Sequence, residues 1–317
     1  MKICLPVLCL AALMAVPAAA QGPSPSEQPA SENAPENAIV VTAQRSGAPM
    51  WTIDTPTGTI ILVGEIRAIP KTTPWQPDRL KDATAQASRV ILGAKPRISP
   101  GDIFRLMFSG GKFTKLPDKT VASEYLTPAQ WARLETLGTA HEEDYSRQSF
   151  LLSSFQMLRK ELRFNRDTAD DASDVVKEAA EDAKVPITRA ATLRGEDIID
   201  NLADAPPTAH ISCLNAAMDA VETGPDVVEQ RGADWRRYDI PAVMANPLEQ
   251  ALGQCWPWAD ETLGSELRTI WVDNITAAQG QSGVTLAVVP LRVLAETGGV
   301  LDRLETQGLD ISGPAWK

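Results

Sequence analysis

Two apolar runs near opposite ends of the chain place the strongest constraint on its fold. Residues 59–63 (TIILV) and residues 285–289 (TLAVV) are short and rich in β-branched side chains, which is typical of strands buried on both faces of a sheet. The first run follows a turn signal at residues 55–58 (TPTG), with proline in the second position and glycine in the fourth. Residues 50–63 therefore predict a hairpin, and the second run predicts a sheet that uses both ends of the chain.

The chain between these runs is predicted to be mainly helical. A helix over residues 77–88 and a buried strand over residues 89–92 (RVIL) follow the first run, and this order favours a parallel pair of strands. A brief edge strand is expected at residues 185–187, because its proline cannot donate to a neighbouring strand. Further helices are predicted over residues 127–140, 149–164 and 170–184, within 194–280, and over 295–307. The predicted fold class is α/β, with an α+β-like arrangement: a small mixed sheet built from the N- and C-terminal segments, with a large helical insertion.

The N-terminal segment predicts export. Lys2, an apolar run and an Ala-Ala-Ala cleavage site have the order of a signal peptide over residues 1–20. Residues 21–47, rich in Pro, Ser and Glu, predict a disordered linker before a folded domain over residues 48–317. The apolar run is shorter than the roughly 20 residues that span a bilayer, although an uncleaved anchor is the alternative. The mature protein is thus predicted to be periplasmic and to have no transmembrane segment.

Charge and cysteine content limit which classes of partner and which cellular compartment the sequence predicts. The chain has 30 Lys+Arg against 41 Asp+Glu and no basic tract, which argues against nucleic acid and anionic membrane surfaces as partners. Removing the signal peptide leaves Cys213 and Cys255, and an even number in an exported protein favours one disulfide. Such a bridge would stabilise the fold by roughly 4 kcal/mol. The alternative is two buried, unpaired thiols.

The two ends of the domain resemble the TraB/GumN family, which is identified with metal-dependent hydrolases. The resemblance lies in residues 50–70 (MWTIDTPTGTIILVGEIRAIP) and in the strand, glycine turn and helix near the C-terminus. In that family a Gly-x-x-His motif follows each strand and supplies metal ligands. Here Arg67 occupies the place of the first histidine, and Gly93 occupies that of a glutamate. The second motif falls on residues 290–293 (PLRV), which contain no histidine. Because arginine has no lone pair for a metal, the resemblance implies a family fold from which the ancestral ligands are missing.

The remaining residues offer little for metal or nucleophilic chemistry. The chain has two histidines, His141 and His210, whereas a catalytic zinc normally takes three protein ligands. His141 precedes Glu142, Glu143 and Asp144 and is interpreted either as a metal cluster or as a solvated helix end. His210 and Cys213 could pair on a helix face only if the cysteine is unbridged. Residues 109–112 (SGGK) superficially resemble a phosphate loop and are expected to form a mobile loop instead.

One positive pattern remains at the ends of the two apolar strands. Arg67 and Arg292 each follow a buried strand, and ligands bind beyond the carboxyl ends of strands in open α/β sheets. With Glu65 they are the candidate ligand-binding residues, holding a small anionic ligand where a cation used to be. In the alternative, each arginine pairs with a nearby acid such as Glu65 or Glu296. No catalytic residue and no metal ligand is predicted.

The sequence therefore favours a non-catalytic, degenerate member of the family with a binding or accessory role in the cell envelope. Its partner would be a small anion or an envelope protein, without a cofactor. One alternative is a metal-dependent hydrolase or peptidase with a rebuilt site, holding a divalent ion such as zinc or manganese. Another is a structural envelope protein that uses Trp235, Trp256 and Trp258 as an interface, although aromatic residues at helical spacing are more often core.

Overall fold

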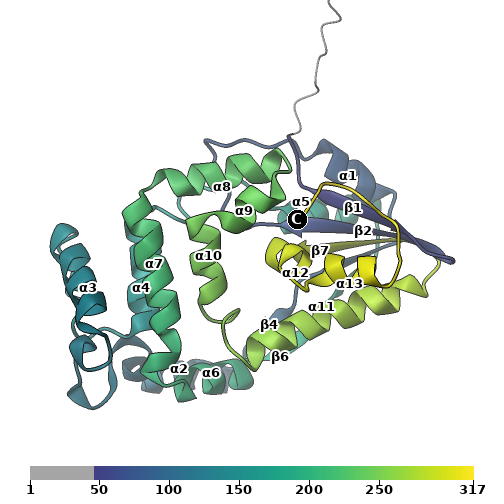
Figure 1. Ribbon diagram of the computed structural model, residues 1–317. Helices are drawn as coiled ribbons and strands as arrows, with labels where there is room; N and C mark the ends of the chain where they lie inside the picture. The colour runs from purple at the N-terminus through teal and green to yellow at the C-terminus, as the bar shows by residue number, and fades with distance from the viewer. Residues whose placement is uncertain (1–45) are drawn as a thin grey trace, which may run out of the picture. The chain divides into compact units, whose positions relative to one another are not determined.

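The computed structural model describes residues 46–317, apart from the side chains of residues 106–109 and 112 (Figure 1). The predicted signal peptide and almost all of the predicted linker lie outside the described residues. Within the described part the chain has a mixed α/β fold, as predicted. No helix in that part is both long enough and apolar enough to cross a bilayer.

The sheet is mixed and has six strands in the order β5-β3-β7-β2-β1-β8. Its strands are β1 (Met50–Asp54), β2 (Gly58–Glu65), β3 (Arg89–Leu92), β5 (Ile187–Arg189), β7 (Gly283–Pro290) and β8 (Ile311–Ser312). β1 pairs antiparallel with β2, which confirms the predicted hairpin. A separate two-stranded parallel sheet joins β4 (Lys95–Arg97) to β6 (Thr192–Arg194).

The C-terminal strand β7 lies in the middle of the sheet. It runs parallel to β2 on one side and to β3 on the other, so the predicted strand–helix–strand unit does not pair its own two strands. The edge strand predicted at residues 185–187 is β5, which lies two residues later and does occupy a sheet edge. All residues of β7 from Thr285 to Val289 are buried. This explains the continuous apolar run, because helices α5 and α11 pack against both β2 and β7.

Helices make up most of the chain between β3 and β7 (Figure 1). The helices are α1 (Asp78–Ala85), α2 (Pro100–Thr114), α3 (Pro128–Ala140), α4 (Phe150–Lys160), α5 (Ala172–Ala183), α6 (Gly195–Asp204), α7 (Ile211–Thr223), α8 (Asp226–Arg236), α9 (Ile240–Ala245), α10 (Pro247–Gln254), α11 (Leu263–Gln279), α12 (Leu291–Ala295) and α13 (Val300–Thr306). Short 3₁₀ turns are η1 (Pro117–Lys119), η2 (Ala122–Glu124) and η3 (Pro207–His210).

Several helix starts follow from capping residues. Thr127 and Gln130 form a capping box before α3, with Pro128 in the first turn. Ser149 accepts from the backbone N–H of Leu152 at the start of α4. Asp171 accepts from the backbone N–H of Asp174 at the start of α5. Each cap satisfies a donor that the first turn would otherwise leave free.

Two sequence predictions about helices are wrong. Residues 109–112 are not a loop but part of α2, which begins at a capping box formed by Ser99 and Asp102. The predicted terminal helix over residues 295–307 is interrupted: α12 ends at Ala295, and α13 begins only at Val300. Gly298 between them has a φ of 71°, which a continuing helix does not allow.

Buried apolar side chains form three clusters. The largest surrounds the sheet and includes Trp51, Trp235 and Leu286. A second joins α3, α4 and α7 around Phe150, and a third joins α4, α7, α8 and α10 around Leu158. The helical insertion therefore has cores of its own and does not depend only on the sheet for burial.

Candidate functional site

The two arginines predicted to bind an anion follow adjacent strands. Glu65 at the end of β2 is the register partner of Pro290 at the end of β7. Arg67 and Arg292 each come two residues later, so both begin at the same carboxyl edge of the sheet. Their side chains then differ, because Arg67 is exposed whereas Arg292 is only 8% exposed.

Arg292 belongs to a buried ion triad. Glu249 on α10 accepts from Arg292 through one carboxylate oxygen and from Arg231 on α8 through the other, with Nη2 2.6 Å away. Arg231 and Glu249 are 3% and 4% exposed. The triad therefore joins α8, α10 and the start of α12 beneath the carboxyl edge of the sheet.

The electrostatics of the triad favour its charged form. Burial alone would raise the pKa of Glu249, but the guanidiniums of Arg231 and Arg292 hold that pKa below its ordinary value. Burial lowers the pKa of Arg292, an effect opposed by Glu249. Two cations share one anion here, so the network carries a net positive charge inside the protein.

Two further contacts fix the triad in place. Arg231 Nη1 donates to the backbone carbonyl of Arg67 at 2.9 Å, which ties the loop after β2 to α8. The guanidinium of Arg292 lies over the Trp258 ring, 5.6 Å from the ring centroid. A Cβ added at Gly253 would lie 2.9 Å from Arg292 Nη1, so the glycine makes room for the guanidinium.

Glu65, at the end of β2, has partners outside the triad. Its Oε1 accepts from the backbone N–H of Ser173 at 2.8 Å, in the first turn of α5. Burial, and then the nearby Asp171, raise the pKa of Glu65 to about 7, while the charge of Arg67 lowers it. Glu65 therefore keeps its proton to a higher pH than an ordinary carboxyl group does.

The acid pairings considered from the sequence need one correction. Arg292 does not pair with Glu296; it pairs with Glu249. Glu296 is held instead by Arg268, whose Nε donates to it at 2.6 Å. No local pattern indicates a pair between Arg292 and Glu249, which precedes it by 43 positions.

Neither histidine lies in a metal-binding arrangement. His141 ends α3 and pairs with Glu161 at 2.5 Å, while Glu143 pairs with Lys160. Cys213 forms a disulfide with Cys255, so a metal pair of His210 with Cys213 is wrong. Among residues 46–317, no three His, Cys, Asp or Glu side chains come together as a metal site. The donors at the sheet edge do not fit a divalent ion, since arginine cannot ligate it and both Glu249 oxygens are engaged.

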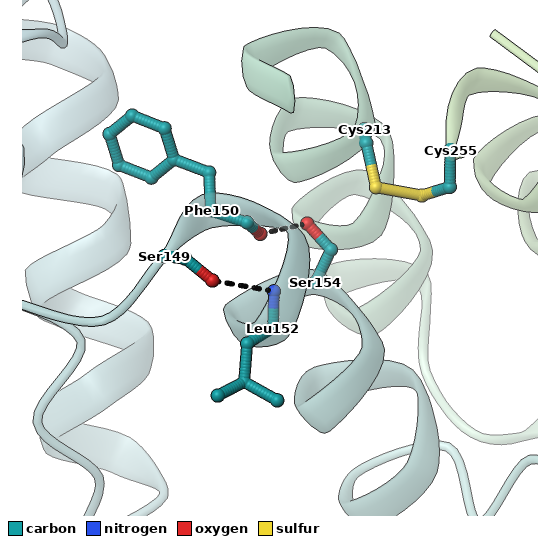
Figure 2. Close-up of a disulfide and its surroundings, with 6 residues drawn as sticks. All are labelled: Ser149, Phe150, Leu152, Ser154, Cys213 and Cys255. Atoms are coloured by element: carbon teal, nitrogen blue, oxygen red, sulfur yellow. Dashed lines mark hydrogen bonds between the residues drawn. A yellow bond between two sulfur atoms is a disulfide. The ribbon is translucent and has the colours of Figure 1, made fainter. Parts of the chain in front are cut away.

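The disulfide joins the start of α7 to the residue after α10, across 42 positions (Figure 2). This is the pairing predicted from the sequence. Of the tryptophans considered as an interface, Trp235 is fully buried and donates to the carbonyl of Gly64 at 2.8 Å. Trp256 and Trp258 are half-buried. Trp235 is therefore core, as tryptophans at helical spacing usually are.

Sequence reasoning missed Arg231 and Glu249. One signal was present: Arg231 falls on the buried face of α8, in step with Val227, Val228 and Trp235. A charge on an apolar face needs a buried partner, but the helical pattern does not say which residue supplies it.

The mixed sheet, with strands from both ends of the described chain and helices between them, defines an α/β protein. The family model of the TraB/PrgY/gumN family matches residues 49–312. The chain belongs to the TraB/PrgY/gumN family. No curated protein and no solved structure matches it.

Proposed function

We propose that this chain is a non-catalytic member of the TraB/PrgY/gumN family that acts as a binding or accessory protein in the cell envelope. The observation that carries the proposal is the buried triad of Arg231, Glu249 and Arg292. It occupies the sheet edge where the family resemblance places a metal, and it engages the carboxylate there with two guanidiniums. In this proposal fixed cationic side chains have taken the place of a cation, and the edge has become structural.

The triad also limits which arginine could bind an anion at the sheet edge. Arg292 is committed to Glu249, so an anion at this edge would meet Arg67 as its exposed cation. A single exposed arginine gives a weak site in water. The binding role is therefore not expected to depend on the two arginines together.

Elemental analysis of the purified mature protein tests the loss of metal chemistry. After incubation with zinc or manganese and dialysis without chelator, we expect far less than one ion per chain. Arg67→His with Val293→His serves as a comparison that places imidazoles at the histidine positions of both motifs. One ion retained per wild-type chain would contradict the proposal.

One observation favours an alternative, a hydrolase with a rebuilt site. A buried carboxylate with a pKa near 7 suits a general base or acid. Under this alternative, activity against peptide or ester substrates would rise through about pH 7 and would be lost in Glu65→Gln. Glu178→Gln, on the exposed side of α5, is the matched control.

The cellular location belongs to the same proposal. A signal peptide over residues 1–20 and a periplasmic mature protein remain predictions from the sequence. Mass spectrometry of the protein from a periplasmic extract should give an N-terminus at Gln21. Recovery of the chain in the cytoplasm with Met1 intact would contradict the envelope role.

A further inference from the structure

The helical insertion contains a cavity of about 740 Å³ that the sheet edge does not share. It lies between the end of α2, the start of α4, the end of α6 and η3. Its apolar wall is formed by side chains from these elements and from the loop before η1: Phe113, Leu116, Phe150, Leu152, Phe155 and Leu202. Small-molecule sites typically have volumes of roughly 300–1,000 Å³ and predominantly apolar walls with a few polar groups.

The charged groups at this cavity compensate one another. Lys115 and Asp118 are both exposed residues of its lining. They carry opposite charges, so neither a cation nor an anion is favoured by net charge. The cavity therefore favours a ligand for its apolar surface area and not for its net charge.

His210 is a polar residue of this wall. It is half-buried, and burial lowers the pKa of its imidazole, against the influence of Asp260. The ring is therefore neutral at pH 7 and has one donor and one acceptor nitrogen. No side chain or backbone group in the described residues hydrogen-bonds this ring. A neutral imidazole without a protein partner suits a ligand with an uncharged polar head.

Covalent and polar contacts hold the wall in place. His210 lies three residues before Cys213, and Trp256 directly follows Cys255, so the disulfide fixes two lining residues from distant segments (Figure 2). Trp256 Nε1 donates to Asn201 on α6 at 2.9 Å. Ser149 Oγ donates to the carbonyl of Phe113 at 2.6 Å, which joins α4 to the end of α2. The disulfide and these hydrogen bonds thus connect the elements that form the cavity wall.

From this wall we infer that the cavity binds one small molecule with an aliphatic chain and an uncharged hydrogen-bonding head, such as a hydroxyl, ester or amide. The chain would contact the phenylalanine and leucine side chains, and the head would bond to His210. The inference rests on the proposed binding role and names its ligand class. It does not depend on the sheet edge, so failure of the metal experiment leaves it standing, and its own failure leaves the metal result standing.

Fluorescence titration with N-phenyl-1-naphthylamine tests the cavity in the full mature chain. We expect saturable binding at about one site per chain. Ala203→Trp places a large ring in the cavity and should weaken binding by at least about tenfold. Ala209→Trp is the matched control, because Ala209 is exposed on η3 and does not line the cavity. If circular dichroism shows Ala203→Trp to be unfolded, Leu152→Gln provides the same test.

Competition against the bound probe tests the head group. At pH 7.5, 1-decanol should displace the probe at roughly a tenth of the concentration that decanoate needs, and His210→Phe should remove this preference. Absence of saturable probe binding by the folded protein would overturn the inference, as would unchanged affinity in the cavity variants. Equal displacement by decanoate would overturn the assignment of an uncharged head.

Discussion

The sheet edge and the helical insertion differ in buried charge and in unfilled volume. At the edge, Arg231, Glu249 and Arg292 fill the interior with ion pairs and are all less than a tenth exposed. In the insertion, a cavity of about 740 Å³ is left open and is lined mainly by apolar side chains. The sheet edge is thus filled by ion pairs. The cavity that could hold a ligand lies among the helices between β3 and β7.

The largest effect should come from breaking the triad. Glu249→Ala leaves two guanidiniums buried without an anion, and we expect the free energy of unfolding to fall by roughly 3–5 kcal/mol. Urea denaturation measures this change. Glu222→Ala is the control, because Glu222 pairs with Arg133 at an exposed site and should cost less than about 1 kcal/mol. Equal costs for the two variants would show that the triad does not hold the edge together.

The disulfide, which lies in the helical insertion, should make the next largest contribution to the free energy of unfolding. Cys213→Ser with Cys255→Ser should lower the free energy of unfolding by about 4 kcal/mol. Urea denaturation of the variant, compared with wild type in the presence and absence of reductant, gives the value. Probe binding should weaken in the same variant, since the bridge holds His210 and Trp256. A variant as stable as the oxidised protein would contradict the bracing role.

Glu65 gives the stability of the sheet edge a dependence on pH. Its pKa is raised to about 7, so the folded state binds the proton more tightly than the unfolded state does. This contribution is complete below about pH 4.5 and is lost as the pH rises through 7. Removing it in Glu65→Gln should change the stability difference between pH 4 and pH 8 by up to roughly 3 kcal/mol. Urea denaturation at both values, with Glu178→Gln as control, measures it, and parallel pH profiles would exclude the effect.

The smallest expected effect is a difference in probe binding between variants of two helix-capping residues. Ser149→Ala and Thr127→Ala each remove a capping side chain, from α4 and α3, and each should cost about 1 kcal/mol. Only Ser149 also bonds to Phe113 in the cavity wall. Probe binding should therefore weaken in Ser149→Ala and stay unchanged in Thr127→Ala. The same loss in both would assign the effect to general helix stability.

Local signals made part of this fold predictable. The bounds of β3 and the start of α3 followed from a short apolar run and from Thr127-Pro128, because both depend on residues a few positions apart. The small sheet of β4 and β6 was missed, since its strands are three residues long and mostly exposed. The place of β7 between β2 and β3 was also missed, because an apolar run shows that a strand is buried but not which strands flank it.

The candidate site was predictable in position but not in chemistry. Strand ends placed Arg67 and Arg292 at the same edge, and the structure agrees. The burial of Arg292 depends on Glu249, from a helix whose packing no local pattern specifies. The cavity was not predicted at all, because its lining comes from four separate parts of the sequence: residues 111–118, 149–155 and 202–210, and Trp256. No local pattern shows that these parts meet.

The central position of β7 has a consequence for how the chain is made. The first strands leave the ribosome early, but their shared neighbour is complete only at Pro290. Until then β2 and β3 carry unpaired edges, and the helices of the insertion can pack before the sheet exists. Long-range strand pairing of this kind is slow, so the β1–β2 hairpin and the β3–β5 pair cannot join into one sheet until β7 has been made.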